Sequence, residues 1–216
     1  MMSETRRAAR RRRSRERLYR KVKRLGLAPK HVAEVGVWYP ERSSVLNFIT
    51  DGVLTDLVEP DPLCVARIRE RFGATPNVRI FECAVYSENT TVTLYRTNES
   101  TFVKGLSAAP ALVNDAYVPS GDDSFQAEGR VFGEIDDGTI DLLSIDTEGC
   151  EWYVLQGLLS RPLVISVETH RKRYRNPYLP QIMGWMREHE YRVWYRTKSD
   201  TVFVPRKMFG PFVRFR

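Results

Sequence analysis

Residues 140–157 read IDLLSIDTEGCEWYVLQG, and this stretch is the most informative part of the chain. The apolar run from Ile140 to Ile145 predicts a buried strand that ends at the carboxylate Asp146. A tight turn follows at 147–149, and a helix then begins near Glu151. In open α/β sheets, ligands bind outside the carboxyl ends of the strands. We therefore expect Asp146 to lie at a ligand site.

The rest of the chain alternates strand and helix patterns on both sides of this stretch. The strand patterns cover 31–37, 54–60, 77–86, 91–96, 162–170, 191–196 and 200–205, and the helix patterns cover 41–49, 63–72 and 179–189. This alternation predicts an α/β fold with a doubly wound, mostly parallel sheet and an antiparallel closing hairpin. Residues 97–130 carry several Gly and Pro residues, and we expect them to form an irregular, lid-like insertion.

The positive charge of the chain is confined to its first residues. The net charge is +7, but residues 1–24 hold twelve Arg and Lys residues against Glu4 and Glu16, and the remainder is slightly acidic. Leu18, Val22 and Leu25 have helical spacing and predict a helix from about residue 14 that docks on the domain. We therefore divide the chain into an Arg-rich tail and helix at 1–25 and one domain at 26–216.

Composition favours a cytoplasmic, soluble protein. The cysteines Cys64, Cys83 and Cys150 have neither metal-ligand spacing nor a disulfide pattern, which indicates a reducing compartment. The Arg-rich start lacks the apolar segment of a secretory signal, and no apolar run has membrane-spanning length.

Residues 140–157 also resemble a known family signature. The segment is similar to I-D-L-L-K-I-D-x-E-G-x-E-x-x-x-L-x-G, which is typical of FkbM-type S-adenosylmethionine-dependent methyltransferases. The resemblance extends more loosely from about His31 to Pro205. It implies a class I methyltransferase fold, which is Rossmann-like, with S-adenosylmethionine as cofactor.

The first predicted strand ends in a turn suited to that cofactor. Residues 34–40 read EVGVWYP, and class I methyltransferases have D/E-x-G-x-x-x-G at this place. Glu34 and Gly36 match, so the resemblance places Glu34 near the cofactor's amino group and the backbone of Gly36 and Val37 beside its methionine part. The later glycine is replaced by Pro40. Trp38 either serves as a cation–π partner of the sulfonium or only packs the turn.

The next two strands supply the predicted nucleoside contacts. Glu59 stands about twenty residues beyond the glycine turn, where a carboxylate accepts hydrogen bonds from ribose hydroxyls, and Pro60 follows it. An NAD-binding fold shares such an acid, but its G-x-G-x-x-G turn is absent. The resemblance further implies that Cys83 and Ala84 line the adenine, although a buried, inert cysteine is the commoner case.

We expect the reacting end at Asp146, Glu148, Glu168 and His170. Methyl transfer to an alcohol requires loss of a proton, so a base or a cation assists it. The strand that ends with Glu168 and His170 resembles the family's I-x-E-x-H, and His170 is better placed as a base than the other two histidines. Alternatively, Asp146 and Glu168, with Glu148 as a further candidate, hold Mg²⁺.

Three further features are interpreted as structural. Asp61 is predicted to cap the helix that follows it, and Glu151 to stabilise the first turn of its helix. The sequence Asn176-Pro177-Tyr178 resembles the N-P-P-Y motif of amino-methylating enzymes, but it stands at the wrong place and we interpret it as a turn.

These observations leave three hypotheses. The first is an O-methyltransferase that acts on a hydroxyl of a sugar, glycolipid or secondary metabolite, so that its partner is a small molecule or a glycan. The second is an RNA methyltransferase that uses the basic tail, which the slightly acidic domain disfavours. The third is a non-catalytic binding module. The tail is also a candidate for peripheral contact with an anionic membrane. The acceptor and the oligomeric state stay open.

Overall fold

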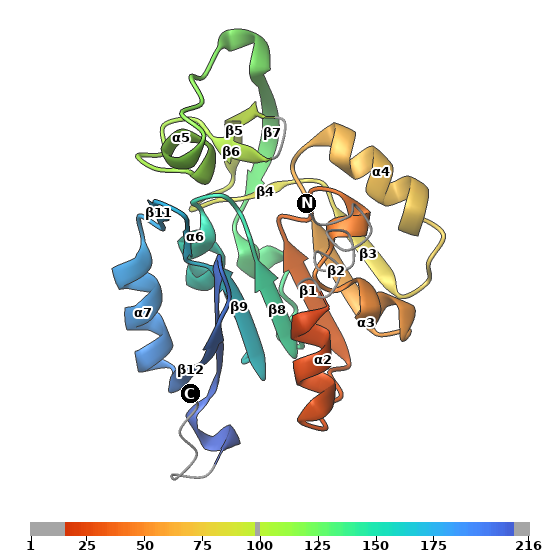
Figure 1. The fold of residues 1–216 in the computed structure, drawn as a ribbon. Helices are drawn as coiled ribbons and strands as arrows, with labels where there is room; N and C mark the ends of the chain where they lie inside the picture. The colour runs from red at the N-terminus through yellow and green to blue at the C-terminus, as the bar shows by residue number, and fades with distance from the viewer. Residues whose placement is uncertain (1–15, 98–99, 210–216) are drawn as a thin grey trace, which may run out of the picture.

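The computed structural model describes residues 16–97 and 100–209. Within them, seven strands form a central sheet in the order β12-β13-β9-β8-β1-β2-β3 (Figure 1). Their bounds are β1 His31–Val35, β2 Leu54–Val58, β3 Val78–Phe81, β8 Leu142–Ile145, β9 Val164–Glu168, β12 Tyr191–Arg196 and β13 Asp200–Pro205. Strands β1, β2, β3, β8 and β9 are parallel, whereas β13 is antiparallel to both β9 and β12. The predicted doubly wound sheet with an antiparallel closing hairpin is confirmed.

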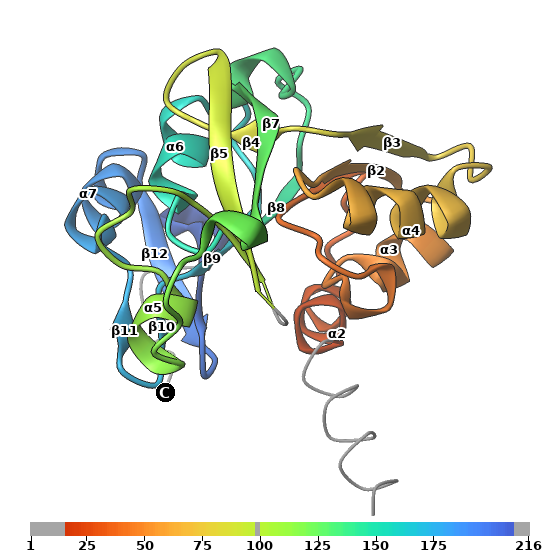
Figure 2. The same ribbon diagram turned by 90° about the horizontal axis from the view of Figure 1, so that it is seen from above.

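Helices cover both faces of this sheet (Figure 2). One face carries α2 (Arg17–Arg24), α3 (Leu46–Thr50) and α4 (Pro62–Phe72), and the other carries α6 (Glu151–Gln156) and α7 (Leu179–Glu188). Successive residues of β1 point to opposite faces, so Val32 packs with α2 and α3, while Ala33 packs with the core under α6 and α7. The short 3₁₀ helices are η1 Pro40–Arg42, η2 Gly121–Asp123, η3 Phe132–Glu134 and η4 Arg206–Met208.

The sheet face beneath α2 changes from apolar to polar along the strands. Val32, Leu142 and Val164 belong to the apolar core on this face. Two residues further on, Glu34 of β1, Ser144 of β8 and Ser166 of β9 are register partners and form a polar row across the sheet. The sheet therefore becomes polar toward its carboxyl edge.

A second sheet stands over that edge (Figure 1). Within the described residues it has four strands, in the order β4-β7-β5-β6. Their bounds are β4 Ala84–Val85, β5 Thr90–Arg96, β6 Thr101–Val103 and β7 Ser124–Arg130, and helix α5 (Pro110–Asn114) lies between β6 and β7. Strands β10 (His170–Arg171) and β11 (Tyr174–Arg175) form a separate small hairpin.

The second sheet corrects one expectation. Residues 97–130 are not irregular throughout, because β6, α5 and β7 lie within them. Strand β7 pairs with β5 over six positions, from Tyr95↔Ser124 to Thr90↔Gly129. Its inward positions, such as Phe125 and Ala127, pack on the core of the second sheet. The prediction missed β7 because its hydrophobic alternation is weak.

Helix α2 docks on the domain as predicted. Leu18 and Val22 are buried, whereas Leu25 is 36% exposed and lies beyond the helix. Arg17 and Lys21 lie over the ring of Tyr195, at 5.0 and 4.5 Å from its centroid. Most of the Arg-rich tail, residues 1–15, lies outside the described residues. No helix in the described part combines the length and the apolar character that crossing a membrane requires.

Candidate active site

A cavity of about 620 Å³ opens at the carboxyl edge of the central sheet, below the second sheet. Residues from β1, β2, β8, β9, β13 and the second sheet line it. Of the predicted site residues, those in the wall are Glu34, Gly36, Val37, Trp38, Glu59, Pro60, Cys83, Ala84, Asp146 and Glu148. The topology therefore gathers most of the predicted residues around one space.

The turn after β1 packs directly on the end of β8. Gly36 has φ +85°, and a Cβ there would lie 1.8 Å from the backbone oxygen of Asp146, so a side chain is excluded. Trp38 also adopts a left-handed conformation, with φ +59°. Its indole Nε1 is buried and has no hydrogen-bond partner among the described residues. A buried donor without a partner is unusual in a folded protein, and Trp38 as a residue lines the cavity.

Glu59 holds this turn from the neighbouring strand. Its Oε2 accepts from the backbone amides of Val37 at 3.0 Å and Trp38 at 2.7 Å, and its Oε1 accepts from the amide of Asp61 at 3.0 Å. The side chain is buried. Burial raises the pKa of Glu59 to about 7, although the hydrogen bonds from Trp38, Asp61 and Val37 oppose the shift. Sequence reasoning placed Glu59 in the site but not its role as the anchor of the turn.

Glu34 has its own partners inside the protein. Its Oε2 accepts from the hydroxyl of Ser43 at 2.5 Å, and its Oε1 accepts from the amide and the hydroxyl of Ser44 at 2.8 and 2.7 Å. The Ser44 hydroxyl also contacts that of Ser144 at 2.8 Å. Glu34 thus lies in the cavity wall and at the same time fixes the loop that leads to α3.

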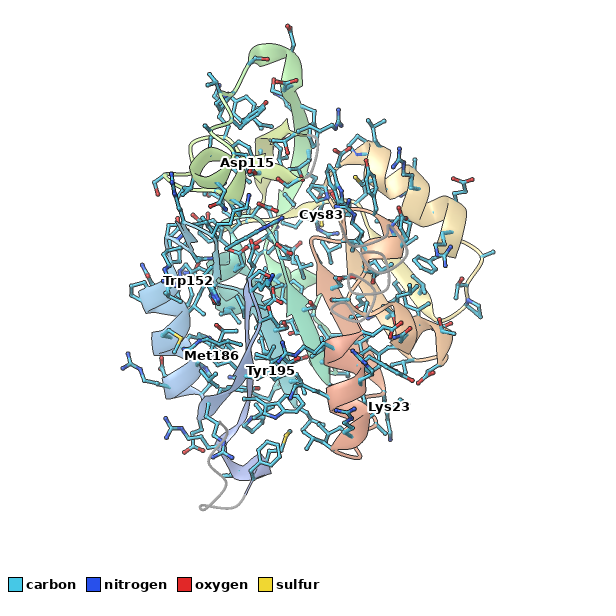
Figure 3. All side chains as sticks on the ribbon, in the orientation of Figure 1. Lys23, Cys83, Asp115, Trp152, Met186 and Tyr195 are labelled. Atoms are coloured by element: carbon cyan, nitrogen blue, oxygen red, sulfur yellow. The ribbon has the colours of Figure 1, made fainter. Side chains whose placement is uncertain are left out.

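Cys83 and Ala84 lie where the chain leaves the central sheet for the second one (Figure 3). Both are buried and both line the cavity. Burial raises the pKa of the Cys83 thiol to about 11, so it is a neutral, inert group at physiological pH. The two residues provide a small apolar wall, as an adenine ring requires.

Asp146, Glu148 and Glu168 come together at the ends of β8 and β9. One carboxylate oxygen from each lies within 4.8 Å of the other two. Asp146 is solvent-accessible in the cavity, whereas Glu168 is only 2% exposed and lies behind the cavity wall, in reach of the other two carboxylates. Partial enclosure in the protein, followed by the negative charges of Asp200 and Glu151, raises the pKa of Asp146 above its usual value. Burial and neighbouring carboxylates also raise the pKa values of Glu148 and Glu168 well above their usual range.

Glu151 and Asn176 support the turn that carries Glu148. Glu151 Oε1 accepts from the amides of Thr147 at 3.0 Å and Gly149 at 3.2 Å, and its Oε2 accepts from the side-chain amide of Asn176. The structural interpretation of Glu151 is confirmed, and Asn176 lies in the turn before α7 as expected. Glu148 itself has φ +56°, so this scaffold holds it in a strained conformation.

The structure places His170 differently from the sequence-based expectation. Its Nδ1 contacts the hydroxyl of Thr169 at 2.8 Å, and His170 is not in the wall of the cavity. The neighbouring Arg171 is in that wall, and its positive charge lowers the pKa values of Asp146 and Glu148 against the dominant effect of burial. Successive side chains of the short strand β10 point in opposite directions, which explains why Arg171 rather than His170 lines the cavity.

Sequence reasoning also missed Asp200 and Arg96. Asp200 is the register partner of Glu168 across β13 and β9 and lines the cavity. Arg96, at the end of β5, binds both carboxylate oxygens of Asp61, at 2.6 and 2.8 Å, and so ties the second sheet to α4. Asp61 also accepts from the amide of Leu63, which confirms it as the helix cap. Neither pairing has a local sequence signal.

The second sheet forms the roof of the cavity. Residues Ser100, Thr101, Phe102 and Val103 line it from above. The following segment packs against the turn of the acidic residues, since a Cβ on Gly149 would lie 3.0 Å from the backbone oxygen of Ala108.

Comparison with known proteins agrees with this architecture. The family model for the methyltransferase FkbM domain matches residues 30–193. Among solved structures, the methyltransferase domain of bacterial CtHen1 shares 10% identity at a TM-score of 0.50, with 89% of this chain and 96% of that chain covered. A SAM-dependent methyltransferase from Aquifex aeolicus shares 11% identity at a TM-score of 0.43, with 86% and 85% covered. No curated protein sequence matches the chain.

Proposed function

The chain belongs to the FkbM family of S-adenosylmethionine-dependent methyltransferases, and we propose that it methylates a hydroxyl group of a sugar, glycolipid or secondary metabolite. The proposal rests on one observation, which is that two different surfaces line the same cavity. Glu59 and the turn at Gly36 form the first surface, and the carboxylates of Asp146 and Glu148 form the second. The first suits a nucleoside cofactor, and the second suits removal of a hydroxyl proton.

The residues present fit S-adenosylmethionine. A carboxylate offers about four acceptor positions, and backbone amides fill three of those on Glu59, which leaves one on Oε1 for a ribose hydroxyl. Cys83 and Ala84 offer an apolar surface to a flat ring. The unsatisfied Nε1 of Trp38, a residue of the cavity wall, would be a donor for an acceptor group of the cofactor. Pro40 is buried in η1 and closes the turn without a second glycine.

The acidic residues carry out the proton chemistry. S-adenosylmethionine supplies an electrophilic methyl group. Asp146 faces the cavity, and its pKa is raised above the ordinary value by burial and by neighbouring carboxylates, which makes it a stronger base. Two arrangements would use the same residues: Asp146 would act as the base, or Asp146 and Glu168 would hold Mg²⁺, which would supply Lewis acidity. Because His170 lies outside the cavity wall, we assign it a supporting role at most.

The remaining wall favours a hydroxylated acceptor. Beyond the acidic residues it is formed by Ser166, Thr197, Ser199 and Asp200, together with Arg17 from α2. Hydroxyls and carboxylates exchange hydrogen bonds with sugar-like molecules. The wall also includes Arg42, Arg171 and several aromatic residues, so the argument against RNA rests on the slightly acidic domain. We keep contact of the Arg-rich tail with an anionic membrane, and a cytoplasmic location, as parts of the proposal.

The test is transfer of a labelled methyl group. The full chain is incubated with S-adenosylmethionine labelled in the methyl group and, in parallel, with polar glycan, glycolipid and RNA fractions. The proposal predicts label in a glycan or small-molecule fraction, in an ether that resists mild base. Incorporation into RNA alone would contradict it and would favour the nucleic-acid alternative.

A further inference from the structure

We propose that Asp146, Glu148 and Glu168 form a binding site for a hard divalent cation of the Mg²⁺ class, at the junction of β8, β9 and the turn before α6. The role of the ion in activating an acceptor hydroxyl rests on the proposed function, but the site itself does not. The sequence offers Glu148 only as a further candidate ligand, and the structure brings its carboxylate to the Asp146 and Glu168 pair.

The spacing of the carboxylates suits such an ion. One oxygen from each residue lies within 4.8 Å of the other two. In octahedral Mg²⁺ sites with metal–oxygen distances of about 2.1 Å, adjacent ligands are about 3.0 Å apart and opposite ligands about 4.2 Å apart. Side-chain rotations that shorten the separations by up to about 2 Å would bring all three oxygens into the coordination sphere. Carboxylate oxygens are the ligands that Mg²⁺ and Mn²⁺ prefer.

Two of these carboxylates have oxygens without a partner. Glu168 is 2% exposed, and its Oε2 makes no hydrogen bond among the described residues. The Oε2 of Glu148 is buried and unpartnered in the same way. A buried carboxylate oxygen without a hydrogen-bond donor is strongly unfavourable, so native structures satisfy it with a proton, a water or a cation. Here the unpartnered oxygens belong to groups that converge on one point.

The surroundings supply little compensating positive charge. The charged groups with the strongest effect on Glu168 are all acidic: Asp146, Glu148, Glu151 and Asp200. Arg171 acts on Asp146 and Glu148 from an exposed position. One guanidinium does not balance this concentration of carboxylates, whereas a divalent cation neutralises two of them directly.

The ion has a defined chemical consequence. Three protein ligands leave octahedral positions for water and for an acceptor hydroxyl, whose pKa falls when its oxygen is coordinated. The proton passes to water or to a carboxylate of the cluster. The acceptor oxygen then forms the new bond to the methyl carbon while the sulfur–carbon bond breaks and the sulfur keeps the electron pair.

Metal binding is measured in the absence of methyl transfer. The full chain, treated with a chelator and freed of it, is titrated with Mn²⁺ by electron paramagnetic resonance and with Mg²⁺ by calorimetry. We expect one saturable site whose affinity falls at least about tenfold in Glu168→Gln and is unchanged in Glu82→Gln. Glu82 pairs with Arg69 and lies outside the cavity wall, so it is a matched control. Circular dichroism checks that each variant is folded, and Glu148→Gln replaces Glu168→Gln if the latter is not.

The outcomes separate the two proposals. Absence of saturable binding in the wild type, or equal affinity in the wild type and the cluster variants, would overturn the metal site. S-adenosylhomocysteine is titrated into the same samples. Cofactor binding and methyl transfer without metal binding leave the proposed function intact. Metal binding without any methyl transfer leaves the site intact and removes the proposed function.

Discussion

The backbone amide of Trp38 donates to Glu59 Oε2 at 2.7 Å, which joins the ends of β1 and β2 across 21 residues of sequence. A second amide, that of Val37, shares the same oxygen. The acid at the end of β2 therefore orders the glycine turn beside it as well as facing the cavity. We therefore propose that Glu59 sets both the shape of the turn and the affinity for the cofactor.

Replacement of Glu59 tests this coupling. Glu59→Ala leaves the amides of Val37 and Trp38 without their acceptor, and an unsatisfied buried donor costs about 1–3 kcal/mol. We expect the affinity for S-adenosylhomocysteine to fall by about tenfold or more, measured by calorimetry. Glu41→Ala, an exposed acid of η1, is the control. Unchanged affinity in Glu59→Ala would remove this residue from the cofactor site.

The stability of the ligand-free protein should depend on pH in a definite direction. The pKa of Glu59 is raised to about 7 from an ordinary value near 4. The folded state therefore binds this proton more tightly than the unfolded state, so the contribution is present below about pH 4 and is lost as the pH rises to about 7. We expect the Tm to fall between about pH 5 and about pH 7, followed by calorimetry, and to fall less in Glu59→Gln. A Tm that rises over this interval would show that this carboxyl is ionised in the folded state.

Asp146 and His170 should differ in their effect on turnover. Asp146→Asn removes the acid in the cavity wall, and we expect the rate to fall by about 10² or more, the scale of acid–base groups. His170→Ala is expected to keep a rate within a few-fold of the wild type, because His170 lies outside the wall. Both are measured with the acceptor fraction that the wild type labels. Equal losses of turnover rate in the two variants would show that His170 takes part in catalysis.

The Arg96–Asp61 pair should hold the roof of the cavity. Asp61 is fully buried and Arg96 is about one-third exposed. Breaking a buried ion pair costs about 3–5 kcal/mol of unfolding free energy. Because Arg96 is partly exposed, we expect Arg96→Ala to lose an amount at the lower end of this range. Urea unfolding measures the loss. Arg196→Ala, an exposed arginine of β12, should have little effect, and equal midpoints for the two variants would show that the pair contributes nothing.

The Arg-rich tail is tested by deletion of residues 1–15 only. Leu18 and Val22 of α2 are buried, so a longer deletion would expose the apolar core. We expect the shortened chain to keep its methylation rate and to lose salt-dependent binding to vesicles that contain anionic lipid. Loss of the rate together with loss of RNA binding would instead support the RNA methyltransferase alternative.

The fold was predictable because its elements have local signals. The apolar run before Asp146, the acid after β2 and the closing hairpin each carry a pattern that short-range physics explains. Strand β7 was missed because its partners in β4 and β5 are remote in sequence and its own alternation is weak. Tertiary pairing, rather than propensity, determines its structure.

The site was predictable as a set of residues but not as a set of contacts. Parallel strands bring Glu59 and Asp146 to one edge, which the sequence indicates. The register that sets Asp200 beside Glu168 depends on the antiparallel insertion of β13, and the side from which His170 faces depends on a two-residue strand. Neither follows from a local pattern, and Asp200 acts on the acidic cluster through its charge.

The most direct test of the account is a calorimetric titration of the full chain with S-adenosylhomocysteine, with and without Mg²⁺. The account predicts saturable binding at one site in the micromolar range despite the proline in the glycine turn. Absence of binding in both buffers, from a protein that is folded by circular dichroism, would contradict the central claim that this cavity holds the methyl donor.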